Sequence, residues 1–313
     1  MIDITHKSGT FRTAIAASRV KASGKTIQKI EDGKIPKGDV WATSRAAGIM
    51  AVKNTSAMLP FCHPINVEYT DVTFKADKAK GIIDIEATVS GIAKTGFEME
   101  ALHGVTTAAL NIYDMLKPVD TSLSIEKTFL REKHGGKSDF RQTIPEDFKA
   151  CVIVCSDSIS AGKKMDKAGQ IIVDKLISTG VKPPEYDIIP DEPDQIRELV
   201  KNKINESFDL VITTGGTGLS PRDVTPEAIR PLLEKEVSGV MEASRQYGMD
   251  RTPYAMLSRG IAGVNGNTLI LTMPGSTRGA RESMDALFPS LFHVYRVLRM
   301  TRHEENHKRG KGK

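Results

Sequence analysis

A chain of 313 residues is long enough for two ordinary domains, and its 39% hydrophobic and 27% charged residues exclude a disordered or fibrous protein. No stretch approaches the roughly 20 consecutive apolar residues of a membrane-spanning helix. The net charge of +5 invites a nucleic-acid partner, but residues 301–313 hold five basic and two acidic side chains, 5 − 2 = +3. We therefore expect a disordered basic tail at 301–313 and no nucleic-acid partner.

The N-terminal residues and the cysteines indicate the cellular compartment. Residues 1–7 are polar and charged, which is not the pattern of a secretory signal. Three cysteines, an odd number in a long chain, do not form a disulfide framework. Cys151 and Cys155 lie in an apolar run where strand alternation places both on one face. With Cys62, they are expected to be reduced thiols in a cytoplasmic protein.

The first half of the chain mixes helical and strand patterns. Apolar spacing predicts an amphipathic helix that Pro60 ends, and a second, longer helix follows two alternating strands joined by a turn. The predicted elements are helices at 40–58 and about 98–116 and strands at 67–74, 81–89 and 123–130. Antiparallel strands covered by helices predict an α+β domain, of the ferredoxin-like kind, at residues 1–147.

The second half alternates differently, after a stretch at 134–148 that lacks a sustained apolar period and is typical of a linker. Continuous apolar strands are predicted at 151–155, 208–214 and 268–273, with helices at about 168–178 and from near Pro226. Strands without alternation, separated by helices, predict an α/β domain with a mostly parallel sheet at 148–300. Ligands of such sheets bind beyond the carboxyl ends of the strands, where this chain places its candidate residues.

Asp114 and Lys117 lie three residues apart near the end of the second predicted helix, so they share one face. A surface ion pair is the ordinary explanation of such a pair. Lys37 precedes the first helix, and His63 lies between two prolines. Glu98 and Glu100 open the second helix, where they can simply favour its N-terminus. Spacing alone leaves both explanations open.

Five segments nevertheless make the first domain resemble the MoaC family of cyclic pyranopterin monophosphate synthases. They are KGDVWATSRAAGI at 37–49, LPFCHP at 59–64, GFEMEAL at 96–102, YDMLK at 113–117 and GGKSDF at 135–140. One departure is His103-Gly104, where the family pattern leads us to expect small residues such as Thr-Ala. The resemblance implies conversion of 3′,8-cyclo-7,8-dihydroguanosine triphosphate into cyclic pyranopterin monophosphate, with release of pyrophosphate and without a metal cofactor.

The resemblance also implies roles for particular residues. Asp114 and Lys117 become the catalytic acid–base pair, and Lys37 lies in the same site. The substrate pocket is implied to contain Cys62, His63, Glu98, Met99 and Glu100. Since a triphosphate needs cations around it, Arg12, Lys133 and Lys137 join Lys37 as candidate phosphate ligands. We expect Asp114 and Lys117 to lie near His63.

In the second domain, a glycine-rich turn at 213–218 ends a predicted strand, which lets backbone amides approach a phosphate. Thr225 is predicted to cap a helix whose first residue is Pro226. Asp157, Asp191 and Asp223 lie at or near strand ends, and their charges would repel a phosphate unless a divalent cation lay between them. Ordinary turn-forming and capping aspartates are the alternative, which suits Asp166 in particular.

This half resembles the MoaB/MogA family of molybdopterin-binding and adenylyltransferase proteins, from 149 to about 300. The matching segments are VCSDS at 154–158, DKAG at 166–169, IPDE at 189–192, TTGGTG at 213–218, RDVTPE at 222–227 and MPGST at 273–277. The resemblance implies a three-layer α/β fold and Mg²⁺-linked catalytic aspartates, Asp191 and Asp223. It implies a phosphate cradle of Gly215, Gly216, Thr217 and Gly218 with Asp157 nearby, and pterin contacts from Pro274, Gly275 and Ser276.

Together the two halves predict a bifunctional enzyme of molybdenum cofactor biosynthesis. The second domain would adenylylate molybdopterin with ATP; the alternative is a non-catalytic pterin-binding or assembly module. Because both families form oligomers with three-fold symmetry, we expect a homohexamer.

Overall fold

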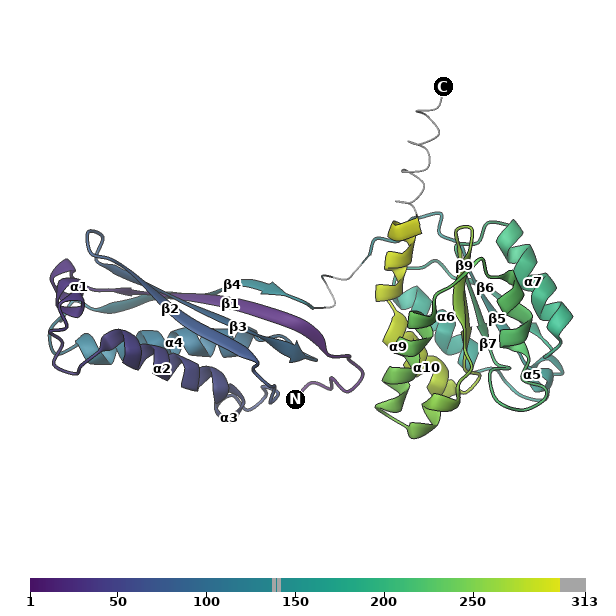
Figure 1. Ribbon diagram of the computed structural model, residues 1–313, viewed down its shortest axis with the longest axis horizontal. Helices are drawn as coiled ribbons and strands as arrows, with labels where there is room; N and C mark the ends of the chain where they lie inside the picture. Colours follow the sequence, from purple (N-terminus) through teal and green to yellow (C-terminus); the bar gives the residue numbers. More distant parts are fainter. Residues whose placement is uncertain (137–138, 140–141, 299–313) are drawn as a thin grey trace, which may run out of the picture. The chain divides into compact units, whose positions relative to one another are not determined.

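The computed structural model describes residues 1–136, 139 and 142–298, and the chain divides into two compact units, Met1–Asp139 and Phe140–Lys313 (Figure 1). The division falls within the predicted linker at 134–148. Lys137 and the tail at 301–313 lie outside the described residues. Within the described part of the chain, no helix combines the length and apolar character needed to span a membrane.

The first unit has a four-stranded antiparallel sheet in the order β2-β3-β1-β4. Its elements are β1 (Thr10–Lys21), α1 (Gly24–Glu31), α2 (Val40–Lys53), α3 (Thr55–Met58), β2 (Tyr69–Asp77), β3 (Ile82–Ala93), α4 (Glu98–Leu116) and β4 (Ser124–His134). This β-α-β-β-α-β arrangement is the ferredoxin-like topology. The predicted α+β domain with an antiparallel sheet is confirmed.

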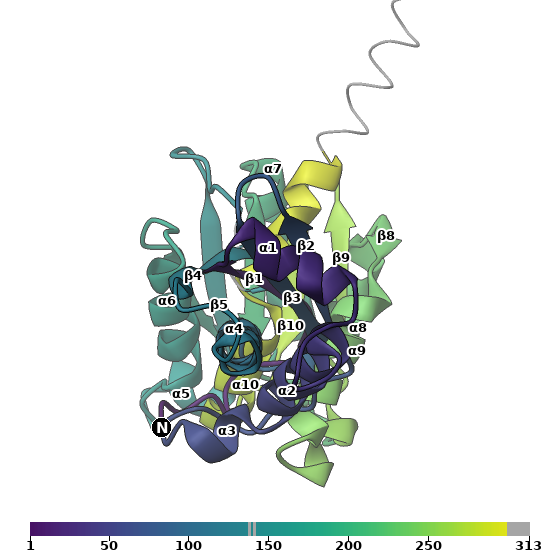
Figure 2. The ribbon, with the colours of Figure 1, turned by 90° about the vertical axis from the view of Figure 1, so that its left-hand side faces the viewer.

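Helices α2 and α4 pack side by side over one face of this sheet (Figure 2). On β1 the buried positions alternate, Ala14, Ala16, Ser18 and Val20, and they face these helices. The two helices come close because Gly48 faces the backbone carbonyl of Gly104 on α4, where a Cβ would lie only 3.1 Å from that oxygen. Gly104, one of the two residues that depart from the family pattern, thus lies at the contact between the two helices.

The single helix predicted at 40–58 is wrong, because α2 ends at Lys53 and α3 begins at Thr55. Asn54 between them has φ −105° and ψ 11°, which is not helical. The Thr55 hydroxyl donates to the Ala51 carbonyl, 3.0 Å away, and competes with regular helix hydrogen bonds. The sequence analysis also missed β1 and α1.

The second unit has a six-stranded sheet in the order β6-β5-β7-β10-β9-β8, of which the first four strands are parallel. Its strands are β5 (Ala150–Cys155), β6 (Glu185–Ile189), β7 (Leu210–Thr214), β8 (Lys235–Glu236), β9 (Ala262–Asn265) and β10 (Thr268–Met273). The antiparallel pairs β10–β9 and β9–β8 form one edge. The predicted mostly parallel sheet is confirmed.

Helices cover both faces of this sheet. The helices are α5 (Asp157–Ser160), α6 (Ala168–Ser178), α7 (Pro193–Asn205), α8 (Thr225–Ile229), α9 (Ser238–Met249) and α10 (Thr277–Leu287), with short 3₁₀ turns η1 (Arg230–Leu232), η2 (Pro253–Leu257) and η3 (Ser290–Phe292). One core contains residues of α6, α9 and α10, and the other contains residues of α7 and α8. The predicted three layers are therefore present.

Two local predictions have opposite outcomes. Cys151 and Cys155 are free, buried thiols that belong to the same core, under α7 and α8, as strand alternation predicted. Thr225, in contrast, is not the cap of α8: Val224 occupies that position, and Thr225 is the first residue of the helix. Its side chain is fully buried.

Candidate functional site

Three residues of the first unit form an ion cluster that we call the Asp114 cluster: Lys37, Asp114 and Lys117. Asp114 lies in the last turn of α4; it accepts a hydrogen bond from Lys37 Nζ at 2.6 Å and forms an ion pair with Lys117 Nζ at 2.8 Å. Lys37 also donates to the Asp114 backbone carbonyl at 2.9 Å. The structure therefore places together the three residues for which the sequence predicted catalytic roles.

The two lysines set the protonation of this cluster. Hydrogen bonds from Lys117 and Lys37 lower the pKa of Asp114 to about 2, and the Asp114 carboxylate raises the pKa of Lys117. Asp114 is therefore a carboxylate at neutral pH, held between two ammonium groups. About half of its side chain is exposed (49%), so a ligand can reach it.

A second group, the Glu100 cluster, surrounds the first turn of α4. The Cys62 thiol lies 3.6 Å from Glu100 Oε1, and His63 Nε2 lies 2.9 Å from the Ile2 carbonyl. Lys133 on β4 pairs with Glu98 at 3.2 Å. Arg12 on β1 interacts electrostatically with Glu98 while it donates to the Ala93 carbonyl, and Met99 is exposed beside them. The described candidates for the pocket thus share one region.

Glu100 is the chemically unusual member of this cluster, because only 3% of it is exposed. Burial raises its pKa, since an ionised carboxylate loses its hydration there. Its Oε2 atom is buried without a hydrogen-bond partner among the described residues. Burial and Glu100 together raise the pKa of Cys62 to about 11, so this thiol is protonated at neutral pH.

The two clusters lie at opposite ends of α4. Glu100 and Asp114 are 14 residues apart, which a helix spans with about 21 Å at roughly 1.5 Å per residue. His63 belongs to the Glu100 end, so the expectation that Asp114 and Lys117 lie near it is wrong within one copy of the chain. The cause is the unbroken helix α4, whose length separates the two ends.

The second unit places the glycine-rich turn at the carboxyl end of β7. Gly215 and Gly216 have φ values of +103° and +60°, the region that favours glycine. A Cβ on Gly215 would lie 2.1 Å from the Cys155 carbonyl, and a Cβ on Gly275 would lie 2.9 Å from the Gly215 Cα. The turn therefore packs directly against the end of β5 and against the Pro274–Ser276 segment.

Asp157 and Asp191 lie at the ends of neighbouring strands, and the backbone N–H of each donates a hydrogen bond to the carboxylate of the other. Asp157 N–H donates to Asp191 Oδ2 at 3.1 Å, and Asp191 N–H donates to Asp157 Oδ1 at 3.0 Å. Arg222 donates to both Asp157 oxygens, at 2.9 and 3.0 Å, and also to Glu192. Arg222 lowers the pKa of Asp157, whereas burial, and then the charges of Asp157 and Asp223, raise the pKa of Asp191.

Asp223 borders the turn on its other side. Its Oδ2 accepts from the Ser220 N–H at 2.8 Å, and a Cβ on Gly218 would lie 2.9 Å from the same oxygen. Thr217, Gly218 and Pro274–Ser276 line one pocket of about 350 Å³. Two of the four predicted phosphate-binding residues therefore share a cavity with the three predicted pterin-binding residues.

The resemblance implies a magnesium ion here, and two oxygens of the site suit one. Asp191 Oδ1 and Thr225 Oγ1 are buried without a hydrogen-bond partner among the described residues. Both face Gly216, where an added Cβ would lie 3.0 and 2.2 Å from them. No three His, Cys, Asp or Glu side chains gather as a metal site in the described ranges. The oxygens fit an ion that takes its other ligands from phosphate and water.

Two site residues were missed from the sequence. Arg222 anchors Asp157, and its position inside the RDVTPE segment was the available signal. Arg259 donates to the Gly218 carbonyl at 2.7 Å and to the Asp223 carbonyl, but it follows η2, far along the chain, where no pattern points to it. Asp166 accepts from the Gly169 and Gln170 N–H groups, which confirms it as a capping residue.

Comparisons with known proteins match both halves of the chain. A sequence profile of the MoaC family matches residues 1–136, and one described as "Probable molybdopterin binding domain" matches residues 151–293. A protein of Chlorobaculum tepidum named molybdenum cofactor biosynthesis bifunctional protein is 38% identical over 299 residues, 96% of this chain and 94% of its own length. A cyclic pyranopterin monophosphate synthase of Listeria monocytogenes is 50% identical over 138 residues, 44% of this chain and 86% of its own.

Solved structures match the second half. The molybdopterin biosynthesis enzyme MoaB of Thermus thermophilus is 43% identical and covers 48% of this chain and 96% of its own, with a TM-score of 0.45.

Proposed function

The chain belongs to the family of bifunctional molybdenum cofactor biosynthesis proteins, and from that premise we propose a reaction for each domain. The first domain converts 3′,8-cyclo-7,8-dihydroguanosine triphosphate into cyclic pyranopterin monophosphate and pyrophosphate. The second transfers adenylate from ATP to molybdopterin. The name of the bifunctional relative supports two activities in one chain, and the name of the synthase that matches the first half supports the first reaction.

The Asp114 cluster is the observation that supports the first reaction. A ring-opening rearrangement needs a proton acceptor beside proton donors, and groups with pKa values pushed apart meet that need. At neutral pH Asp114 is an ionised carboxylate, the proton-accepting form, and the ammonium groups of Lys37 and Lys117 hold protons beside it. The same two cations bind the negative charge of a triphosphate.

We further propose that two copies of the chain complete this site. Glu100, a buried acid with a raised pKa, is suited to donate a proton, but about 21 Å of α4 separates it from Asp114. A substrate of nucleotide size does not reach both ends of one α4. If Asp114 of one copy faces the Glu100 cluster of another, all the predicted pocket residues serve one substrate.

Product analysis of single variants tests the two reactions. We expect Asp114→Asn to abolish cyclic pyranopterin monophosphate formation and to leave adenylylation intact, and Asp223→Asn to do the reverse. Loss of both products in either variant, with a folded protein by circular dichroism, would contradict independent sites.

Complementation tests the two-copy site. Asp114→Asn and Glu100→Gln are each expected to be inactive in the first reaction, and a mixed oligomer of both is expected to recover activity, because one interface then holds an intact site. A mixed oligomer as inactive as its parents would refute the shared site. Unmixed variants, taken through the same exchange procedure, are the control.

In the second domain, Asp191 and Asp223 would hold the magnesium ion, with the buried Thr225 hydroxyl beside them. When bound, such an ion neutralises phosphate charge and orients the group that is transferred. The turn at Gly215–Gly218 would bind a phosphate through backbone N–H groups, and its three glycines allow the close packing that shapes the turn. Arg222 fixes Asp157, which in turn orients Asp191.

The alternative for this domain, a non-catalytic pterin-binding or assembly module, predicts a different result. Incubation with molybdopterin, ATP and Mg²⁺ gives an adenylylated product only if the domain is catalytic. The carboxylates retained at Asp191 and Asp223 on either side of the turn favour catalysis.

The assembly and the compartment are also proposals. A homohexamer is supported by the incomplete site of the single copy, and native mass spectrometry would measure it. A cytoplasmic location is supported by three free thiols, two of them buried.

A further inference from the structure

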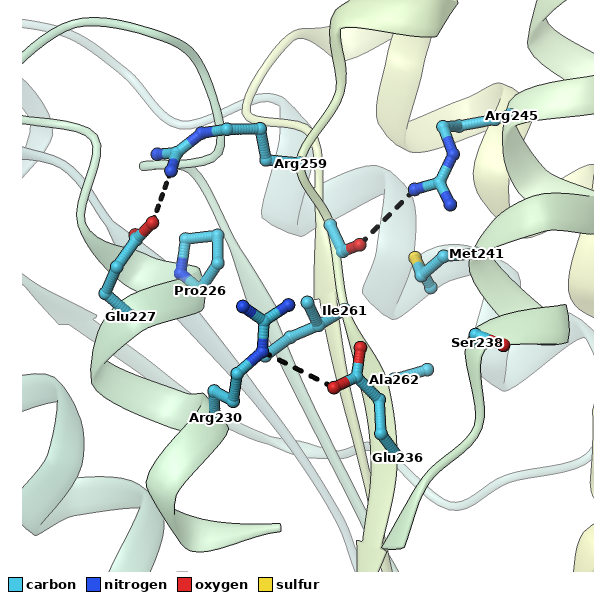
Figure 3. A pocket seen from close by; sticks show the side chains of 11 residues that line it. Pro226, Glu227, Arg230, Glu236, Ser238, Met241, Arg245, Arg259, Ile261 and Ala262 are labelled. Atoms are coloured by element: carbon cyan, nitrogen blue, oxygen red, sulfur yellow. Dashed lines mark hydrogen bonds and ion pairs between the residues drawn. The ribbon is translucent and has the colours of Figure 1, made fainter.

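A second pocket of the second unit, lined by the residues in Figure 3, shares Arg245 and Met241 with the pocket beside the glycine-rich turn. It has a volume of about 340 Å³, at the lower end of the roughly 300–1,000 Å³ of small-molecule sites. We call it the arginine pocket because Arg230, Arg245 and Arg259 line it, from η1, α9 and the segment before β9. Neither of the two proposed reactions takes place in this pocket.

The pocket has more positive than negative side chains. Three arginines face two glutamates, Glu227 and Glu236, so its lining has a net charge of 3 − 2 = +1. Met241, Ile261 and Ala262 form part of the surface, and electrostatic interactions are stronger beside such apolar groups than in water.

The three guanidinium groups differ in how many of their nitrogens already form hydrogen bonds or ion pairs among the described residues. Arg259 uses all three of its nitrogens, on the Gly218 and Asp223 carbonyls and on Glu227. Arg230 pairs with Glu236 through Nε, at 3.4 Å, and its two terminal nitrogens have no hydrogen bond among the described residues. Arg245 has no carboxylate partner in the described part of the chain and donates only to the Gly260 carbonyl, at the long distance of 3.5 Å.

Two guanidinium groups with unused donors are suited to an anion that accepts several hydrogen bonds. Planar, forked donors of this kind match phosphate oxygens, and charge-assisted hydrogen bonds are stronger than neutral ones. A single carboxylate has only two oxygens, so it accepts fewer hydrogen bonds from two arginines than a phosphoanhydride does. A volume of about 340 Å³ accommodates pyrophosphate.

We propose that the arginine pocket binds pyrophosphate through Arg230 and Arg245, at a site separate from the turn at Gly215–Gly218. The choice of pyrophosphate among phosphates rests on the proposed function, because both proposed reactions release it. The same group can also arrive as the phosphate end of a nucleotide in the neighbouring pocket, since Arg245 and Met241 line both cavities.

Calorimetric titration of the full chain with inorganic pyrophosphate, without substrates, tests this site independently of either reaction. Arg230→Gln is expected to weaken binding by about tenfold or more, because it removes a charged donor. Glu236→Gln is expected to tighten binding several-fold, because it frees Arg230 from its carboxylate. The ion pair is largely exposed, so both variants are expected to fold.

Two arginine variants are matched controls. Arg197→Gln, on the surface of α7, and Arg278→Gln, which lines only the neighbouring pocket, are expected to leave pyrophosphate affinity unchanged. Wild-type affinity in Arg230→Gln, no measurable binding by the wild type, or a loss confined to Arg278→Gln would each overturn the proposal. ATP binding weakened by both Arg230→Gln and Arg278→Gln, with no free pyrophosphate bound, assigns the pocket to the phosphate end of a nucleotide instead.

Discussion

Asp157 and Asp191 hold each other by reciprocal hydrogen bonds, in which the backbone N–H of each donates to the carboxylate of the other at 3.1 and 3.0 Å. This exchange uses Asp191 Oδ2 and leaves Asp191 Oδ1 buried and directed towards Gly216. Asp157 is therefore a positioning residue, and Arg222 fixes it in turn.

Asp157→Ala is expected to reduce adenylylation by about 10–100-fold, the usual effect of losing a residue that orients a metal ligand. Apparent Mg²⁺ affinity, measured from the rate as a function of Mg²⁺ concentration, is expected to fall in parallel. Glu192→Gln removes the other carboxylate partner of Arg222 and serves as the control. Equal losses in the two variants would show that only the charge around Arg222 matters.

The lysines around Asp114 keep the pKa of its carboxyl group low. Because the folded pKa of Asp114, about 2, is below its ordinary 3.8, the cluster stabilises the fold fully above pH 3.8 and loses this contribution as the pH falls towards 2. In Lys117→Met the pKa of Asp114 is expected to move up towards 3.8. Carbon-13 NMR titration of the Asp114 carboxyl would follow this shift, and an unchanged midpoint would show that Lys117 is not its partner in solution.

Some long, regular elements of the fold could be predicted from the sequence, whereas β1, α7, α9 and α10 were not predicted. The limits of α4, α6 and β10 agree with the predicted ranges, because each buries an apolar stripe or run that polar residues end. β1 was missed because its buried face consists largely of small residues such as Ala14 and Ala16, which give no strong alternation. Its position between two other strands follows from tertiary packing.

The candidate sites show a similar division. The glycine turn and its aspartates could be predicted as one site, since the carboxyl ends of parallel strands meet at one edge of a sheet. The first site could not be assembled correctly, because residues separated by a helix were treated as neighbours. Arg259 could not be found at all: its contacts with Gly218 and Asp223 depend on how η2 returns to the sheet.

The burial of Glu100 can be tested by measuring the stability of the fold at different pH values. Its folded pKa is raised above the ordinary 4.5, so the buried carboxyl destabilises the fold as the pH rises above 4.5 and the unfolded chain ionises first. Glu100→Gln is expected to melt at a higher temperature than the wild type at pH 8. The difference is expected to shrink near pH 4, where both forms are neutral. Glu98→Gln, at the more exposed neighbouring carboxylate, is the control.

The glycine turn can be tested by adding a side chain, because its geometry leaves no space for one. At Gly216, with φ +60°, a Cβ would lie 2.2 Å from the Thr225 hydroxyl, so Gly216→Ala must shift either the turn or α8. Adenylylation is expected to fall at least 100-fold with a lower melting temperature, while cyclic pyranopterin monophosphate formation in the other domain stays unchanged. Gly239→Ala, on α9 with no atom within 4 Å of the new Cβ, is expected to keep both activities and to stabilise the helix by about 0.5–1 kcal/mol. Full adenylylation by Gly216→Ala would mean that the turn does not hold phosphate in the way its backbone suggests, and that Asp191 and Thr225 face Gly216 for structural reasons alone.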